Sequence, residues 1–348
     1  MKIGIAGFPG SGKTTILNAL TGLHADVGLG ASSSGKPNLG MIKVPDGRVD
    51  ALAKIFSPKK VTYAEIAFVD FPDPPGEKGR LDEKVITQMR EVDALAHVVR
   101  AFADPAQTAP EPLADLESFK TELVIADLAI AERRVERLAK EKGKERERDL
   151  LERVRRELDS GRELRRMTLA AEEEASLSGY GFLTLKPRLV VLNVGEGDVA
   201  TGIPAAIKAS FDGDELQAVV ISGKVEMELS ELDPGDRKSF EADLGLSESA
   251  RDRFIQASYR LMSLMSFLTA GEDEVRAWTI RRGDSAVRAA GKIHSDIARG
   301  FIRAEVIPYD DFVANGSEAK CRAAGKLRLE GKDYVVADGD VIHFRFNV

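Results

Sequence analysis

The sequence predicts an α/β fold in which a core of buried strands and helices is interrupted by a helical hairpin and followed by a small β-rich domain. Three observations support this prediction. Short apolar runs alternate with helical patterns, a charged stretch with helical spacing separates two sets of them, and short strands with turn signals dominate the C-terminal part. We expect three domains: a core of residues 1–112 and 180–265, a hairpin of residues 113–179, and a C-terminal domain of residues 266–348.

The core opens with a glycine-rich loop between a strand and a helix. Residues 1–6 are a short apolar strand, and residues 15–22 have apolar side chains at helical spacing. Between them, Gly7-Phe-Pro-Gly-Ser-Gly-Lys13-Thr14 fills the pattern G-x-x-x-x-G-K-[ST]. The pattern and its flanking elements together predict a phosphate-binding loop, or P-loop.

The residue types of this loop suit a nucleoside triphosphate. Gly7, Gly10 and Gly12 allow backbone N–H groups to turn toward phosphate oxygens, and the dipole of the following helix attracts the anion. The Lys13 amine would reach the β- and γ-phosphates, and the Thr14 hydroxyl would bind Mg²⁺. We therefore expect Mg²⁺ as the cofactor.

Two further residues are candidate Mg²⁺ ligands. Residues 23–37 are small and polar, and Ser34 in this loop is a candidate to meet the ion once a γ-phosphate is present, although a solvated serine explains it equally well. Residues 61–69 read as one strand that ends in Asp70. An aspartate there is typical of the carboxylate of the Mg²⁺ shell, and the upstream P-loop favours this role over that of a turn former.

A histidine lies in the next predicted strand. Residues 85–92 look like a helix, and residues 93–102 like a buried strand that contains His97. A lone histidine in an apolar run is usually structural. Because the strand follows the segment expected to line the γ-phosphate, a catalytic role for His97 is the alternative.

The charged stretch predicts two antiparallel helices. Apolar residues recur three and four positions apart before and after Gly143, which interrupts the pattern. Residues 132–166 hold fourteen Lys and Arg against ten Asp and Glu, although the whole chain has a net charge of −7. Most such charge is the solvated face of a thin hairpin, and the basic excess also permits contact with RNA.

The core resumes with predicted strands at residues 187–193 and 217–222 and a helix at residues 247–268. The C-terminal domain then has predicted strands at residues 275–280, 301–307, 333–336 and 341–346, with a turn at residues 338–340 between the last two.

Asn193-Val-Gly-Glu196 follows one of these strands, where GTPases carry N-K-x-D. The Asn193 carboxamide can pair with adenine in a bidentate way, and Glu196 in place of aspartate changes the reach that suits guanine. We therefore favour ATP over GTP. Ser222-Gly-Lys224, after the next strand, is a candidate to close over the base.

Composition limits the remaining possibilities. Cys321 is the only cysteine, so no intrachain disulfide can form, and no run of about eighteen apolar residues exists. We expect a cytoplasmic protein with no membrane or DNA partner.

The chain resembles the YchF/Obg-like ATPase family, within the translation-factor-related P-loop NTPases. The resemblance covers essentially the whole length and is carried by residues 7–15 (GFPGSGKTT), 37–52, 92–102 (VDALAHVVRAF), 193–196, 270–280 (AGEDEVRAWTI) and 293–313. It implies a Mg²⁺-dependent ATPase that also binds GTP, an inserted coiled-coil hairpin, a C-terminal TGS domain of the ubiquitin-like β-grasp type, and association with the ribosome or ribosomal RNA.

Family roles carried onto matching positions imply a set of site residues. The implied phosphate-binding residues are Gly10, Ser11, Gly12, Lys13, Thr14 and Thr15, and the implied metal-binding residues are Thr14, Ser34 and Asp70. The implied base contacts are Asn193, Val194, Glu196 and Ser222, and the implied catalytic residue is His97.

One departure concerns the segment after Asp70. Asp70-Phe-Pro-Asp73 stands where the family has D-x-x-G, so a carboxylate replaces a glycine close to the γ-phosphate. The departure predicts slow or altered turnover. Three alternatives stay open. They are a GTPase of the same fold, a non-hydrolysing, nucleotide-dependent ribosome-binding adaptor, which Asp73 favours, and a small-molecule kinase, which only the run GSGKTT suggests.

Overall fold

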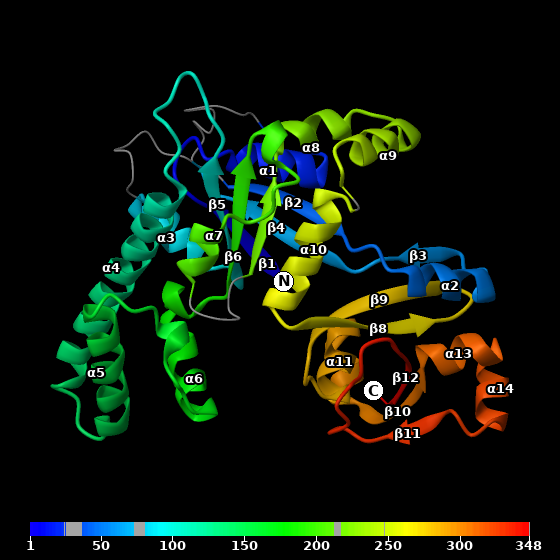
Figure 1. Ribbon diagram of the computed structural model, residues 1–348. Helices are drawn as coiled ribbons and strands as arrows, with labels where there is room; N and C mark the ends of the chain where they lie inside the picture. Colours follow the sequence, from blue (N-terminus) through cyan, green and yellow to red (C-terminus); the bar gives the residue numbers. More distant parts are fainter. Residues whose placement is uncertain (24, 26–36, 73–80, 212–216, 247, 348) are drawn as a thin grey trace. The chain divides into compact units, whose positions relative to one another are not determined.

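The computed structural model of the protein describes residues 1–23, 25, 37–72, 81–211, 217–246 and 248–347. The chain forms two compact units, one of Met1–Met41 and Ala67–Ala257 and the other of Ile42–Ile66 and Ser258–Val348. Each unit contains a six-stranded sheet (Figure 1).

The sheet of the first unit has the order β2-β4-β1-β5-β6-β7. Its strands are β1 (Lys2–Ala6), β2 (Asn38–Lys43), β4 (Glu65–Asp70), β5 (Ala94–Ala101), β6 (Arg188–Val194) and β7 (Ala218–Ile221). The pairs β1–β4, β1–β5, β5–β6 and β6–β7 are parallel. Every residue of β6 is buried, which is typical of a parallel strand covered on both faces.

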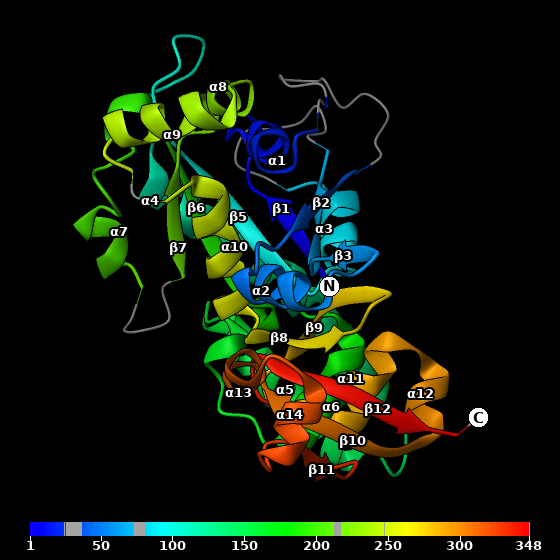
Figure 2. The same ribbon diagram turned by 90° about the vertical axis from the view of Figure 1, so that its right-hand side faces the viewer.

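Helices of the first unit follow the strands and leave the glycine loop at the carboxyl edge of the sheet (Figures 1 and 2). Their bounds are α1 (Lys13–Thr21), α3 (Glu83–Met89), α7 (Ala205–Ala209), α8 (Gly223–Ser230), α9 (Pro234–Asp243) and α10 (Ala250–Leu261), the last of which crosses into the second unit. Ligands of parallel α/β folds bind at this carboxyl edge.

The predicted hairpin is present as two long helices, α4 (Pro112–Leu138) and α5 (Glu145–Asp159), that lie side by side (Figure 1). Apolar side chains from both helices form one buried cluster that includes Ala131, Leu138, Leu151 and Val154. Helix α6 (Ala171–Leu177) and short 3₁₀ turns (Leu164–Arg166, Ser178–Tyr180 and Leu183–Leu185) lead back to β6.

The sheet of the second unit has the order β11-β10-β12-β8-β9-β3. Its strands are β3 (Lys60–Thr62), β8 (Leu264–Ala270), β9 (Glu274–Arg281), β10 (Phe301–Pro308), β11 (Arg328–Glu330) and β12 (Asp340–Phe346). Its helices are α2 (Gly47–Phe56), α11 (Ala286–Ile293), α12 (Ser295–Arg299), α13 (Tyr309–Asn315) and α14 (Glu318–Ala323). Clusters around Phe267 and around Phe312 form its core.

The structure corrects three predicted elements. Residues 61–69 are two strands, because β3 pairs with β9 in one sheet while β4 pairs with β1 in the other. The predicted helix 247–268 stops at Leu261, and residues 264–268 belong to strand β8. Residues 333–336 form no strand and contribute only an isolated bridge between Ser285 and Val335.

The compact units divide the chain differently from the predicted domains at residues 42–66 and 258–265, and the first unit includes the predicted hairpin. Residues 42–66, which the prediction assigned to the core, belong to the second unit through α2 and β3. Leu52 of α2 packs in the same buried cluster as Leu268 and Val275. These packing partners of the helix lie more than two hundred residues away in the sequence, so no local pattern assigns it to the second unit.

Candidate nucleotide-binding site

The glycine loop turns tightly between β1 and α1, as its sequence requires. Gly7, Gly10 and Gly12 have φ angles of 148°, 77° and 89°, which residues other than glycine rarely adopt. A β-carbon would lie 2.3 Å from the Val98 carbonyl oxygen at residue 7 and 2.2 Å from Asn193 Nδ2 at residue 12. Only glycine therefore fits these two positions.

The cation of the site is nearly buried. Lys13 is 4% exposed, and its Nζ donates a hydrogen bond to the Phe8 carbonyl oxygen at 3.2 Å. This bond folds the lysine side chain back along the loop that it follows in sequence. Ser11, between the second and third glycines, is also buried. The loop thus encloses the positively charged Lys13 amine.

The first residue after the lysine is linked to the end of β4. Thr14 Oγ1 donates a 2.7 Å hydrogen bond to Asp70 Oδ2, and Asn38 Nδ2 donates to the same oxygen at 3.4 Å. Asp70 is 2% exposed. Hydroxyl and carboxylate oxygens are hard ligands, so Thr14 and Asp70 fit a Mg²⁺ ion whose other ligands are phosphates and water. Ser34, the third predicted ligand of this ion, and Asp73, predicted close to the γ-phosphate, lie outside the described residues.

Asn193 joins the glycine loop to the start of α8. Its Nδ2 donates to the Ser11 carbonyl oxygen at 2.9 Å, and its Oδ1 accepts from the Gly223 backbone N–H at 3.0 Å. Ser222 caps the same helix by accepting from Val225 N. The sequence prediction gave Asn193 to the base, whereas here both of its amide atoms hold two loops together.

The remaining predicted base residues lie around this junction. Val194 is the last residue of β6 and is buried, while the Glu196 side chain is 52% exposed and its Oε2 lies 3.8 Å from Lys224 Nζ. Thr15 lies beside Gly223, where a β-carbon would stand 3.2 Å from Thr15 Cγ2. Glu196 is therefore the accessible carboxylate of the predicted base segment.

His97 lies deep in the core. It is 0% exposed, and its ring stacks on Phe119 of α4 with centroids 3.8 Å apart. Burial, and then the positive charges of Arg188 and Lys13, hold the pKa of His97 well below 6.5. Within the described residues neither ring nitrogen has a hydrogen-bond partner. The imidazole is thus neutral, and this geometry favours packing over proton transfer.

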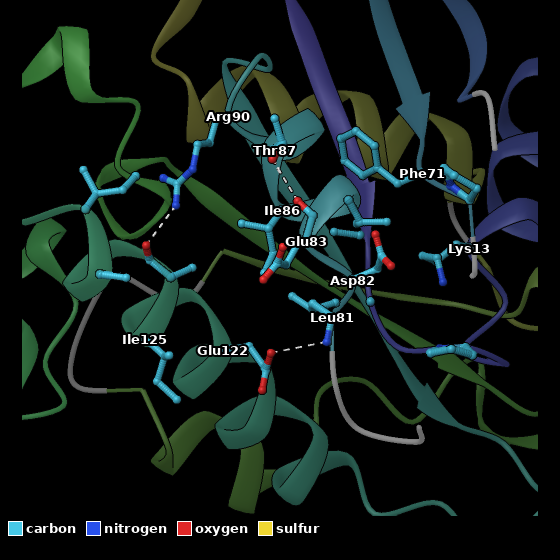
Figure 3. Close-up of a pocket in the computed structure, with 18 of the residues that line it drawn as sticks. Lys13, Phe71, Leu81, Asp82, Glu83, Ile86, Thr87, Arg90, Glu122 and Ile125 are labelled. Atoms are coloured by element: carbon cyan, nitrogen blue, oxygen red, sulfur yellow. Dashed lines mark hydrogen bonds between the residues drawn. The ribbon is translucent and has the colours of Figure 1, made fainter. Parts of the chain in front are cut away.

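A cavity of about 620 Å³ extends from the lysine end of the glycine loop between α3 and α4. Figure 3 shows Lys13 at one end, apolar side chains such as Phe71 and Ile86 along the walls, and Glu122 of α4 beside Leu81. Glu122 Oε2 accepts a 3.3 Å hydrogen bond from Leu81 N. No local sequence pattern predicts this cavity, because its walls come from helices that meet only in the folded chain.

The glycine cradle, its buried lysine and the Thr14–Asp70 pair, placed at the carboxyl edge of a parallel sheet, define a P-loop nucleotide-binding protein. A family profile described as "50S ribosome-binding GTPase" matches residues 2–133. A second profile, YchF-GTPase_C, described as "Protein of unknown function (DUF933)", matches residues 264–347.

Full-length relatives identify the family. The chain is 40% identical over 364 residues to "Ribosome-binding ATPase YchF" of Bacillus subtilis (strain 168), covering all of both chains. It is 41% identical to the Haemophilus ducreyi protein of the same name, covering 100% of this chain and 99% of the relative. The solved structure of the Schizosaccharomyces pombe YchF GTPase superposes with a TM-score of 0.85 at 28% identity, covering 99% of this chain and 97% of that one. The chain belongs to the YchF family.

Proposed function

We propose that this protein is a Mg²⁺-dependent ATPase that acts as a nucleotide-controlled switch on the ribosome. The observation that carries the proposal is the Thr14–Asp70 hydrogen bond of 2.7 Å beside Lys13, since it brings a metal-binding pair and a phosphate-binding cation together at the glycine cradle. The names of the full-length relatives, ribosome-binding ATPases, support the ribosome as the partner and ATP hydrolysis as the activity.

In this proposal the chain's own groups bind and orient the triphosphate. The N–H groups of the glycine loop and the Lys13 amine bind the phosphate oxygens, as the φ angles of the loop permit. Thr14 and, through water, Asp70 hold Mg²⁺, which neutralises charge on the phosphates when it is bound. Ser34 remains a predicted third contributor.

The base preference rests on the segment after β6. Asn193 holds the glycine loop and the start of α8 together, and Glu196 is the accessible carboxylate that meets the base edge. A GTPase of the same fold is the second candidate, because the solved Schizosaccharomyces pombe relative is called a GTPase. Dissociation constants for ATP and GTP, measured side by side by calorimetry, decide between them; tighter binding of GTP would reverse the assignment.

Hydrolysis is a separate question from binding. A catalytic role for His97 stays a prediction, and its burial against Phe119 requires a rearrangement before the ring could meet a water molecule at the phosphates. A non-hydrolysing adaptor is a further alternative. Turnover of ATP with and without ribosomes, in the wild type and in His97→Ala, separates these cases, and no turnover in the presence of ribosomes would favour the adaptor.

We further propose that partner contacts are made by the α4–α5 hairpin and by the C-terminal domain, residues 266–348, as a TGS domain. The basic excess of residues 132–166 supports contact of the hairpin with ribosomal RNA. A ribosome-binding protein works in the cytoplasm. Among the described residues no helix is both long and apolar enough to cross a bilayer.

The test of the whole proposal is ATP binding by the purified chain. We expect Mg²⁺-dependent binding in the micromolar range that is abolished in Lys13→Ala, together with cosedimentation with ribosomes. A wild-type chain that is folded by circular dichroism but binds neither ATP nor GTP would refute it.

A further inference from the structure

The loop between β5 and α4, residues 102–111, stands above the carboxyl ends of the strands in both views (Figures 1 and 2). Its return toward α4 is fixed by Arg100, the second-to-last residue of β5. Arg100 is 8% exposed, and its Nη2 donates to the carbonyl oxygens of Thr108 at 2.8 Å and Ala109 at 3.4 Å. Hydrogen bonds from a buried guanidinium restrain the loop, although it has no regular secondary structure.

A second set of bonds orients one side chain of this loop. Asp104 accepts from Ala106 N at 2.9 Å, from Gln107 Nε2 at 2.7 Å and, through its carbonyl oxygen, from Gln107 N at 3.0 Å. The bond from Ala106 N, followed by that from Gln107, holds the pKa of Asp104 below its usual value. Because Nε2 donates to Asp104, the two ends of the Gln107 carboxamide cannot exchange without loss of a bond.

The carboxamide of Gln107 lies against the glycine cradle. A β-carbon added at Gly10 would stand 2.7 Å from Gln107 Oε1, 2.9 Å from Nε2 and 3.1 Å from Cδ. The first two distances are shorter than real β-carbons show, so a side chain at residue 10 would have to displace the end of the Gln107 side chain. The contact joins two segments that are 97 positions apart, and it lies in neither the metal pair nor the base segment.

A glycine-rich loop loses more backbone entropy on ordering than other loops, so a side chain that restrains it in advance favours ligand binding. We propose that Gln107 is a positioning residue of the phosphate loop, and that it holds the Gly10 peptide in the conformation that binds the nucleotide phosphates. The inference rests on the proposed nucleotide binding. It assigns the β5–α4 loop a direct part in that binding, and it makes the affinity for ATP sensitive to the position of this loop.

The test changes Gln107 and Gly10, first separately and then together. Gln107→Ala removes the restraint and should weaken ATP and ADP binding about tenfold, whereas Thr108→Ala, a matched change of an exposed side chain in the same loop, should leave both affinities unchanged. Gly10→Asn alone should also weaken binding, because its side chain meets Gln107. Asparagine tolerates a positive φ, so the double variant Gly10→Asn/Gln107→Ala has room for the new side chain and should bind ATP better than Gly10→Asn alone.

Calorimetry gives the affinities, and thermal unfolding confirms that each variant is folded. Equal affinities of Gln107→Ala and the wild type, or a double variant that binds no better than Gly10→Asn, would overturn the inference. Failure of the wild type itself to bind nucleotide would instead refute the proposed function, so the two failures are distinguishable.

Discussion

Arg90, at the end of α3, forms an ion pair with Asp127 in the middle of the hairpin helix α4, with Nη1 2.8 Å from Oδ1. Asp127 is 0% exposed and accepts three further hydrogen bonds, from Leu183 N, Thr184 N and Thr184 Oγ1. Arg90 also donates to the carbonyl oxygens of Gly181 and Ala126. One buried carboxylate thus ties the end of α3 and the middle of α4 to the 3₁₀ turn Leu183–Leu185 that leads back to β6.

This network predicts a large stability effect. Asp127→Ala leaves Arg90 and two backbone N–H groups without their acceptor and should lower the free energy of unfolding by about 3 kcal/mol or more. Urea denaturation followed by circular dichroism measures the loss. Asp149→Ala, whose side chain is 72% exposed on the same hairpin, is the control and should cost little. Equal midpoints for the two variants would contradict the prediction.

Removal of the Thr14 hydroxyl should abolish the effect of Mg²⁺ on ATP affinity. We expect Thr14→Ala to bind MgATP about tenfold more weakly than the wild type, and to match it in the presence of EDTA. Thr14→Ser keeps the hydroxyl and should retain most of the Mg²⁺ dependence. Titration calorimetry at several Mg²⁺ concentrations is the measurement, and an undiminished Mg²⁺ effect in Thr14→Ala would exclude this residue as a ligand.

Shortening Glu196 should shift the base preference toward guanine. Glu196→Asp restores the carboxylate reach that suits guanine, and the ratio of GTP to ATP affinity should rise about tenfold. Glu228→Asp is a matched control, because Glu228 lies 3.9 Å from the same Lys224 but on α8. A similar change of ratio in both variants would indicate that Lys224, and not the base, responds.

The buried His97 predicts acid sensitivity. Its pKa is lowered in the folded chain, so below pH 6.5 the unfolded chain binds a proton that the folded chain does not, and the free energy of unfolding falls as the pH falls. The contribution is about 1.4 kcal/mol per pH unit for one proton. His97→Leu should flatten this slope, measured from urea midpoints between about pH 5.5 and about pH 7.5. An unchanged slope would mean that other groups cause it.

Much of the fold could be predicted because the signals are local. The strand–glycine–helix order around Lys13, the buried strand around His97 and the helical spacing on both sides of Gly143 each lie within a short window, and the structure has all three elements. The prediction of a single strand over residues 61–69 was wrong, because β-propensity does not tell which sheet a residue joins. The helices of residues 286–323 were missed, since they are short and lie among turn residues.

The sequence by itself determined the chemistry of the cradle, because Gly7, Gly12, Lys13 and Thr14 lie within eight consecutive residues and therefore in one loop. Only the tertiary structure decided which distant groups meet it. Asn193 bonds to Ser11 and Gly223, and the end of the Gln107 side chain lies where a side chain at Gly10 would extend. Such contacts depend on strand order and on the path of a loop, and these follow from packing of the whole chain and from no local pattern.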